Sequence, residues 1–122
     1  RFPPSFRFSL ISFCQSISLR GAKLNGANLD EADLSGANLS GVDLSRASLI
    51  KIRALGTCFE QTILTGVSVG DWSVDEDTNL DSVICDYVYL RTRSRYPERY
   101  PCSQKLKPGE FAKLFQNELI NR

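Results

Sequence analysis

Residues 17–76 read ISLRG AKLNG ANLDE ADLSG ANLSG VDLSR ASLIK IRALG TCFEQ TILTG VSVGD WSVDE, which is twelve units of five residues without a gap. The third residue of each unit is large and apolar in eleven of the twelve units. The first residue is apolar in ten of the twelve, and it is most often Ala. This internal repeat, rather than any single motif, decides the fold.

A period of five residues fits neither an α-helix nor a flat β-strand. On an α-helix, a step of five residues turns the side chain by about 500°, so the central leucines would be spread around the whole circumference. On a flat strand, side chains alternate between two faces, so an odd period would send successive leucines to opposite faces. The pattern becomes consistent if each unit is extended for about three residues and then turns a corner, so that its first and third side chains both point inward.

The fifth residue of each unit supplies the corner. Glycine can adopt the positive φ that a turn uses, and it occupies this position at Gly21, Gly26, Gly36, Gly41, Gly56 and Gly66. The other fifth positions are charged or polar, so we expect this corner to face water; they are Glu31, Arg46, Lys51, Gln61, Asp71 and Glu76. Four corners of about 90° would close a coil of twenty residues, and successive coils would stack about 4.8 Å apart.

Side chains spaced by twenty residues support this coil. Residues 34, 54 and 74 form one column beside residues 32, 52 and 72, and large and small side chains exchange places at Ile52 and Ala54, as expected in an interior of fixed volume. A one-residue slip at Asp77 precedes three further units, TNLDS VICDY VYLRT. We expect the central side chains to fill the interior, namely Leu19, Leu24, Leu29, Leu34, Leu39, Leu44, Leu49, Phe59 and Leu64.

The units AKLNG, ANLDE, ADLSG and ANLSG resemble the A(D/N)LxG signature of pentapeptide-repeat proteins. The resemblance implies a right-handed quadrilateral β-helix with Leu or Phe at the central inward site. We therefore expect an all-β solenoid of about four coils with a short C-terminal α-helix. The segment from VICDYVYLR through LKPGEFAKLFQ is similar to a tail that follows the repeats in some larger bacterial members. Because the chain also begins at Arg1 and contains no Met, we expect it to be part of a larger bacterial protein.

Four segments are expected along the chain. Residues 1–16 are an aromatic N-terminal cap or the start of a further coil, residues 17–92 are the repeat β-helix, residues 93–107 are a basic loop, and residues 108–122 are a helical segment. Solenoids need capped ends. We expect the apolar stripe of the helical segment to dock on the end of the solenoid, with docking on another domain or protein as the alternative. Trp72 is too large for its inward position and should mark a local break against which the tail packs.

The composition argues against catalysis. The chain has 122 residues, a net charge of +1 and no histidine, which removes the usual general base near neutral pH and the commonest zinc ligand. Asp33 and Asp43 occupy outward positions, and a filled interior offers no cleft in which two carboxylates could meet. We expect no enzyme activity, no catalytic residue, no metal site and no cofactor.

The cysteines and the hydropathy indicate the cellular compartment of the protein. Cys14, Cys58, Cys85 and Cys102 lack metal-like spacing, and we favour four free thiols in a reducing compartment over two disulfides. No apolar stretch approaches the roughly 20 residues that cross a bilayer. The sequence therefore favours the cytoplasm and no membrane association.

The leading functional hypothesis is a noncatalytic protein-protein interaction or scaffold module. Its partner would be another protein or a neighbouring domain of the parent chain, and an end-to-end dimer is a further form of assembly. The candidate contacts are apolar side chains at outward corners, arginines of the basic segment and the apolar stripe of the tail helix: Ile50, Leu55, Ile63, Arg91, Arg93, Arg95, Arg99, Phe111, Leu114 and Phe115.

Two alternatives involve nucleic acid. Some members of the resembled family regulate type II topoisomerases by mimicking duplex DNA. About four coils give a rod of roughly 18 Å, over which duplex DNA displays on the order of ten charges, whereas residues 17–77 hold nine acidic and five basic residues, a net charge of −4. Direct nucleic-acid contact through the basic segment, in which Tyr96 and Tyr100 alternate with the arginines, is the third hypothesis; the segment lacks a recognisable reader motif, and we rank it below the others.

Overall fold

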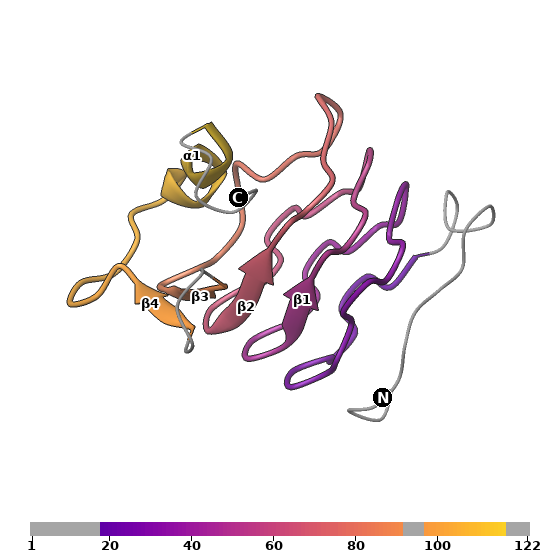
Figure 1. The fold of residues 1–122 in the computed structure, drawn as a ribbon. Helices are drawn as coiled ribbons and strands as arrows, with labels where there is room; N and C mark the ends of the chain where they lie inside the picture. The colour runs from indigo at the N-terminus through magenta and orange to yellow at the C-terminus, as the bar shows by residue number, and fades with distance from the viewer. Residues whose placement is uncertain (1–17, 92–96, 117–122) are drawn as a thin grey trace.

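The structure is a computed structural model that describes residues 18–91 and 97–116 (Figure 1). The expected N-terminal cap at residues 1–16, the side chains of Arg93 and Arg95, and residues 117–122 of the tail lie outside the described residues.

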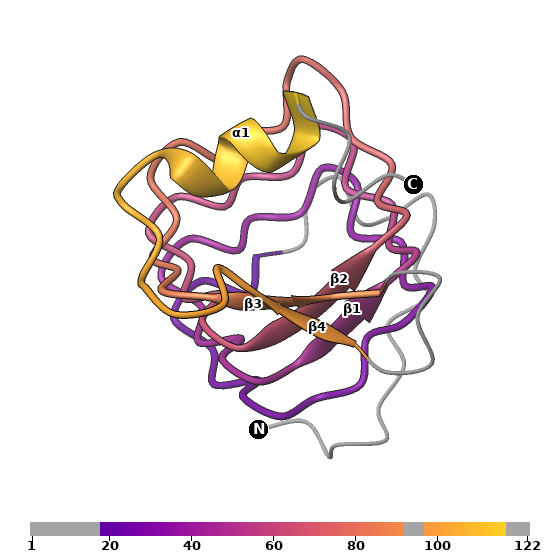
Figure 2. The same ribbon diagram turned by 60° about the vertical axis from the view of Figure 1, so that its left-hand side comes forward.

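Residues twenty positions apart lie side by side on successive turns of the chain. Parallel bridges on four sides of the winding join Ser18 to Asn38, Lys23 to Asp43, Asn28 to Ser48, and Asp33 to Arg53, and the same columns continue into the next turn. Figure 2 shows these turns lying over one another. The chain therefore has a β-helix-like fold, as the twenty-residue columns of the sequence predict.

The extended strands form one open sheet. Strand β1 (Ser48–Ile50) pairs in parallel with β2 (Val67–Gly70), which pairs in parallel with β3 (Val88–Leu90). Strand β4 (Glu98–Tyr100) adds to β3 in antiparallel orientation and completes the order β1-β2-β3-β4. The other sides of the turns are held by isolated bridges. The strands of the described residues thus form an open four-stranded sheet. They do not form the closed, four-sided β-helix expected from the family resemblance.

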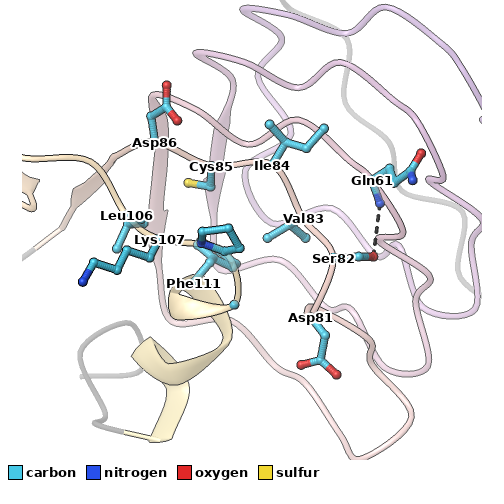
Figure 3. A pocket seen from close by; sticks show the side chains of 12 residues that line it. Gln61, Asp81, Ser82, Val83, Ile84, Cys85, Asp86, Leu106, Lys107 and Phe111 are labelled. Carbon is cyan, nitrogen blue, oxygen red and sulfur yellow. Dashed lines mark hydrogen bonds between the residues drawn. The ribbon is translucent and has the colours of Figure 1, made fainter.

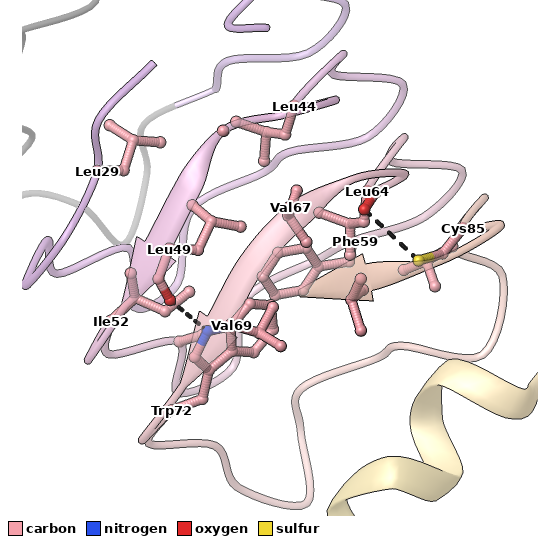
Figure 4. Packing of buried hydrophobic residues seen from close by; sticks show 14 of the residues in the cluster. Leu29, Leu44, Leu49, Ile52, Phe59, Leu64, Val67, Val69, Trp72 and Cys85 are labelled. Carbon is pink, nitrogen blue, oxygen red and sulfur yellow. Dashed lines mark hydrogen bonds between the residues drawn. The ribbon is translucent and has the colours of Figure 1, made fainter. Parts of the chain in front are cut away.

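The central side chains of the repeats lie in the core between the sides of the winding (Figure 4). All of the predicted inward residues from Leu24 to Leu64 are at most 2% exposed, whereas Leu19 is half-buried. Two first positions hold threonine, and both are fully buried. The hydroxyl of Thr57 donates to the carbonyl oxygen of Leu34 at 2.6 Å, and that of Thr62 to the carbonyl oxygen of Leu39 at 2.8 Å. A hydroxyl is tolerated in this core because it donates a hydrogen bond to the backbone of the preceding turn.

The corners adopt the left-handed conformation that the glycines predict. All six glycines at fifth positions have positive φ, and so do five non-glycine residues there, with φ between 54° and 63°: Glu31, Arg46, Lys51, Gln61 and Asp71. The side-chain oxygens of four second-position residues accept the backbone N–H two residues on at 3.0 Å, which fixes the following corner; they are Asn28, Asp33, Asn38 and Asp43. These acidic and amide side chains therefore serve the turns.

The slip predicted at Asp77 appears as a change of spacing. Bridges beyond this point join residues 21 apart, such as Cys58 with Asn79 and Ile63 with Ile84. The extra residue is accommodated in a corner where a carboxylate oxygen of Asp75 accepts the backbone N–H groups of Gly56 at 2.9 Å and of Asp77 at 3.0 Å.

The tail departs from expectation in one respect. Part of the segment 93–107, expected to be a loop, forms strand β4 because the free edge of β3 offers unpaired backbone groups to it. Helix α1 (Glu110–Gln116) begins two residues later than the expected start at 108. The carboxylate of Glu110 accepts the backbone N–H of Lys107 at 2.6 Å, which closes the turn before the helix. Strand β4 and α1 both lie at the C-terminal end of the stacked turns (Figure 1).

Candidate interaction surface

The C-terminal end of the repeats is organised around Trp72. Its indole stacks on the ring of Phe59, with centroids 5.8 Å apart, and meets the edge of Phe111 at 5.9 Å. The indole N–H donates to the carbonyl oxygen of Leu49, and the residue is only 3% exposed (Figure 4). Trp72 therefore joins the last turns to the tail, as its size predicts, and offers no free face to a ligand.

The tail is attached to the last turn by backbone, ionic and apolar contacts. The backbone N–H of Leu106 donates to the carbonyl oxygen of Asp86 at 2.7 Å, and the ammonium of Lys105 lies 3.9 Å from the carboxylate of Asp86. Leu106, Phe111 and Leu114 are all buried in the core cluster. Helix α1 thus packs on the end of the repeats, in agreement with the docking that we favoured from the sequence.

A groove of about 570 Å³ lies between the last turn and the tail, within the size range of ligand sites. Val83 and Cys85 point toward α1 from the last turn, whereas Ile84 points away from it (Figure 3). Residues of the tail from Leu106 to Phe111 form the other wall. Ile84 is 50% exposed, and within residues 18–91 and 97–116 it is the large hydrophobic side chain that stands open to solvent. Sequence reasoning missed it because its unit follows the slip, although its column partner Ile63 was noted.

The groove has little chemical reactivity. Burial, together with the negative charge of Asp86, raises the pKa of the Cys85 thiol to about 12, so the sulfur is protonated at neutral pH. Cys58, half-buried, lies in a second hollow of about 410 Å³ with its sulfur 3.3 Å from the hydroxyl of Ser40. Cys58, Cys85 and Cys102 are free thiols, and Cys14 lies outside the described residues. The described hydrogen bonds of the thiols in these two hollows go to the hydroxyl of Ser40 and to the carbonyl oxygens of Leu64 and Tyr87.

The outer face of the sheet carries a second cluster. Tyr89 and Arg99 are register partners on β3 and β4, and the ring of Tyr87 meets that of Tyr89 edge-on at 5.8 Å. The guanidinium carbon of Arg99 lies 4.3 Å from the centre of the Tyr87 ring, and one of its N–H groups donates to the carbonyl oxygen of Pro101 at 2.6 Å. We call Tyr87, Tyr89 and Arg99 the Tyr87–Arg99 cluster. The sequence singled out Arg99, whereas Tyr87 and Tyr89 were identified only as part of the repeats.

Some predicted contact residues are not available at the surface. Ile50 is buried, and its register partner on the next turn is Gly70. Phe111 and Leu114 are each 2% exposed because they pack into the core of this chain. These placements correct the expectation that the three residues form exposed contacts.

The remaining predicted contact residues differ in their exposure to solvent. Leu55, Ile63 and Arg99 are half-buried and Arg91 is exposed. Arg93, Arg95 and the side chain of Phe115 lie outside the described part of the chain. The structure brings Arg99 into the Tyr87–Arg99 cluster and places Ile63 in the same bridge column as Ile84, but it does not gather all of these residues into one surface.

Searches for a metal centre and for a membrane span are negative over the described part of the chain. Among these residues, His, Cys, Asp and Glu side chains do not gather in groups of three or more that could hold a metal ion. The helix found there is too short and too polar to cross a bilayer. Asp33, which is only 9% exposed, is held by the backbone N–H of Ser35 and lies 4.0 Å from the guanidinium of Arg53.

Comparison with known proteins agrees with the repeat pattern. Residues 14–49 and 28–66 match the family described as pentapeptide repeats, with eight copies. A search of curated proteins finds no match. The matched region covers the stretch in which glycine corners, Asx turns and parallel bridges recur every five or twenty residues. The repeats of residues 14–66 are therefore pentapeptide repeats.

Proposed function

We propose that the chain is a noncatalytic protein-protein interaction or scaffold module, built on a right-handed quadrilateral β-helix of nearly four coils. The observation that carries this proposal is the filled interior. Leu34, Leu44, Leu49, Phe59 and Leu64 are all 0% exposed, so only the outer surface can contact another molecule. The family is generally associated with interaction and scaffold roles, which supports the same conclusion. We further propose that the module acts in the cytoplasm as part of a larger bacterial protein.

The groove beside α1 is the apolar surface that supports this proposal. It combines an apolar floor at Val83 and Cys85 with the exposed side chain of Ile84 at its border. The C-terminal end of the stack is covered by α1 and β4, so an end-to-end dimer would have to use the opposite end. Contact with a protein partner is therefore expected along the sides of the winding.

Site-specific crosslinking tests the proposal. A photo-crosslinking amino acid would be placed at Ile84 in the full chain, and at Lys23 as a matched control, because Lys23 occupies the same bridge column three turns earlier. We expect a discrete protein adduct from position 84 and none from position 23. Equal labelling from both positions, or no adduct from either, would argue against a specific interaction surface there.

DNA mimicry is a weaker candidate for this chain. Duplex DNA presents a continuous series of negative charges, whereas the corner column of Glu31, Lys51 and Asp71 alternates in sign. A supercoiling assay with a type II topoisomerase tests the point, and we expect no inhibition and no protection. Nucleic-acid contact through the basic segment is tested by mobility shift with single- and double-stranded DNA, where we expect no complex at physiological salt.

A further inference from the structure

We infer that the Tyr87–Arg99 cluster, together with Arg46, is a docking site for an acidic peptide segment of a partner protein. This inference rests on the proposed function and names the chemistry of its partner. The site is on the outer face of the sheet, separate from the groove beside α1.

Arg46 and Tyr87 meet over a glycine. A Cβ atom added at Gly66 would lie 3.4 Å from Cγ of Arg46 and 3.4 Å from the phenolic oxygen of Tyr87. The stem of the arginine and the tyrosine hydroxyl therefore border the same point on the surface. A Cβ atom there would be in ordinary contact with both side chains, and the φ of 79° at this corner favours glycine.

Arg99 contacts the same tyrosine. It comes from β4, and its guanidinium covers one face of the Tyr87 ring at 4.3 Å. Its bond to the carbonyl oxygen of Pro101 uses one guanidinium N–H and fixes the position of the group. The guanidinium of Arg99 thus lies on the ring of Tyr87, and the side-chain stem of Arg46 lies near its hydroxyl.

These positive charges are not neutralised locally. In residues 18–91 and 97–116, ion pairs form at Arg53 with Asp33 and at Lys105 with Asp86, but not at Arg46 or Arg99. A guanidinium binds a carboxylate through two parallel hydrogen bonds, and Arg suits this role better than Lys. Two arginine side chains beside one tyrosine therefore fit a peptide that carries neighbouring acidic side chains.

The packing of the tyrosines disfavours a nucleic-acid ligand. Single-stranded nucleic acid binds through bases that stack on aromatic faces. Arg99 covers one face of Tyr87, Tyr89 contacts that ring edge-on, and Tyr100 packs against the core. An acidic peptide needs the guanidiniums alone and no free aromatic face.

The inference is tested by titrating the full chain with hexaglutamate peptide. Calorimetry measures the affinity, and NMR of the backbone amides locates the binding site. We expect shifts at Tyr87, Tyr89 and Arg99, and binding that weakens with added salt. The double variant Arg46→Gln/Arg99→Gln should bind about tenfold more weakly or worse, because both charge-assisted bonds are lost. Arg53→Gln is the matched control, since it removes a positive charge on another side of the winding; we expect less than about a twofold change.

Further variants and a nucleic-acid ligand distinguish an acidic-peptide site from non-specific charge attraction and from nucleic-acid binding. Tyr87→Ala removes the ring that Arg99 covers and should weaken binding although both arginines remain, whereas Tyr87→Phe should retain most of it. Circular dichroism confirms that each variant is folded. The inference is overturned if wild type does not bind, if Arg53→Gln loses as much affinity as the double variant, or if oligothymidylate binds more tightly at the same residues. Such failure would leave the crosslinking result at Ile84 untouched, so the proposed function is tested separately.

Discussion

The indole of Trp72 lies nearly parallel to the ring of Phe59, with 16° between the two planes, although the two residues belong to different sides of the winding. Phe59 occupies a central inward position and Trp72 a first position, so the stack fills the interior across a corner. Phe111 then covers the edge of the indole from α1. The three rings connect the repeats to the tail, which makes the single tryptophan a sensor of tail docking.

Phe111→Ala should therefore destabilise the chain and change its fluorescence. Removing a fully buried phenylalanine leaves a cavity that costs about 3–5 kcal/mol in the free energy of unfolding. The emission of Trp72 should shift to longer wavelength because water reaches its edge. Urea unfolding followed by circular dichroism and the emission spectrum check both effects. Lys113→Ala, an exposed change on the same helix, should alter neither.

The corners provide a pair of opposite predictions. Gly26 has a φ of 74°, and a Cβ atom there would meet nothing within 4 Å, so Gly26→Ala changes the backbone preference alone. It should destabilise the chain by about 1 kcal/mol. Lys51 has a φ of 59°, and Lys51→Gly should relieve a similar strain and leave the chain as stable or more stable. Thermal unfolding of both variants measures whether each change raises or lowers the stability. A loss of stability for Lys51→Gly would contradict the strain argument.

Acid should weaken the corner at the slip. The hydrogen bond from the Gly56 backbone N–H, helped by Thr78 and by the backbone at Asp77, lowers the pKa of Asp75 below its ordinary value of 3.8. A carboxylate with a lowered pKa stabilises the folded state above its unfolded pKa, and this contribution is lost as the pH falls through the folded pKa. Asp75→Asn should thus be less stable than wild type near neutral pH, and the difference should shrink as the pH falls through the lowered folded-state pKa of Asp75. Asp77→Asn, with the same change of charge, should show a much smaller pH-dependent difference.

The thiols should differ in reactivity. Cys102 is exposed, whereas Cys85 is buried with a pKa of about 12. Iodoacetamide at about pH 8 should therefore modify Cys102 early and Cys85 only when the chain unfolds, because the thiolate is the reactive form. Peptide mass mapping over time follows both residues. Rapid labelling of Cys85 in the folded chain would show that the groove beside α1 opens readily.

The repeat period accounts for most of what sequence reasoning predicted correctly. Five-residue spacing places the central leucines inside, and the glycines mark the corners because few other residues accept positive φ without strain. The slip at Asp77 is visible because it shifts every later apolar residue by one position. The exchange at Ile52 and Ala54 follows from the constant volume of the interior, and both are fully buried.

Contacts that depend on another part of the chain were beyond prediction. Strand β4 has an unremarkable sequence, Glu98–Tyr100, and forms because the edge of β3 is open to it. Ile50 looked exposed from its position in its own unit, but it lies buried beside Gly70 of the next turn. The contact of Arg99 with Tyr87 requires the antiparallel return of the tail, which no local pattern indicates. In each case a tertiary neighbour decides the environment of the residue.

The corner from Asp75 to Thr78 absorbs an additional residue while the columns on either side continue to pair. A winding that tolerates one extra residue at an exposed bend can receive longer peptides at the same point without loss of alignment between its layers. This bend is consequently a natural place for evolution, or for an engineer, to graft a recognition loop onto the rod.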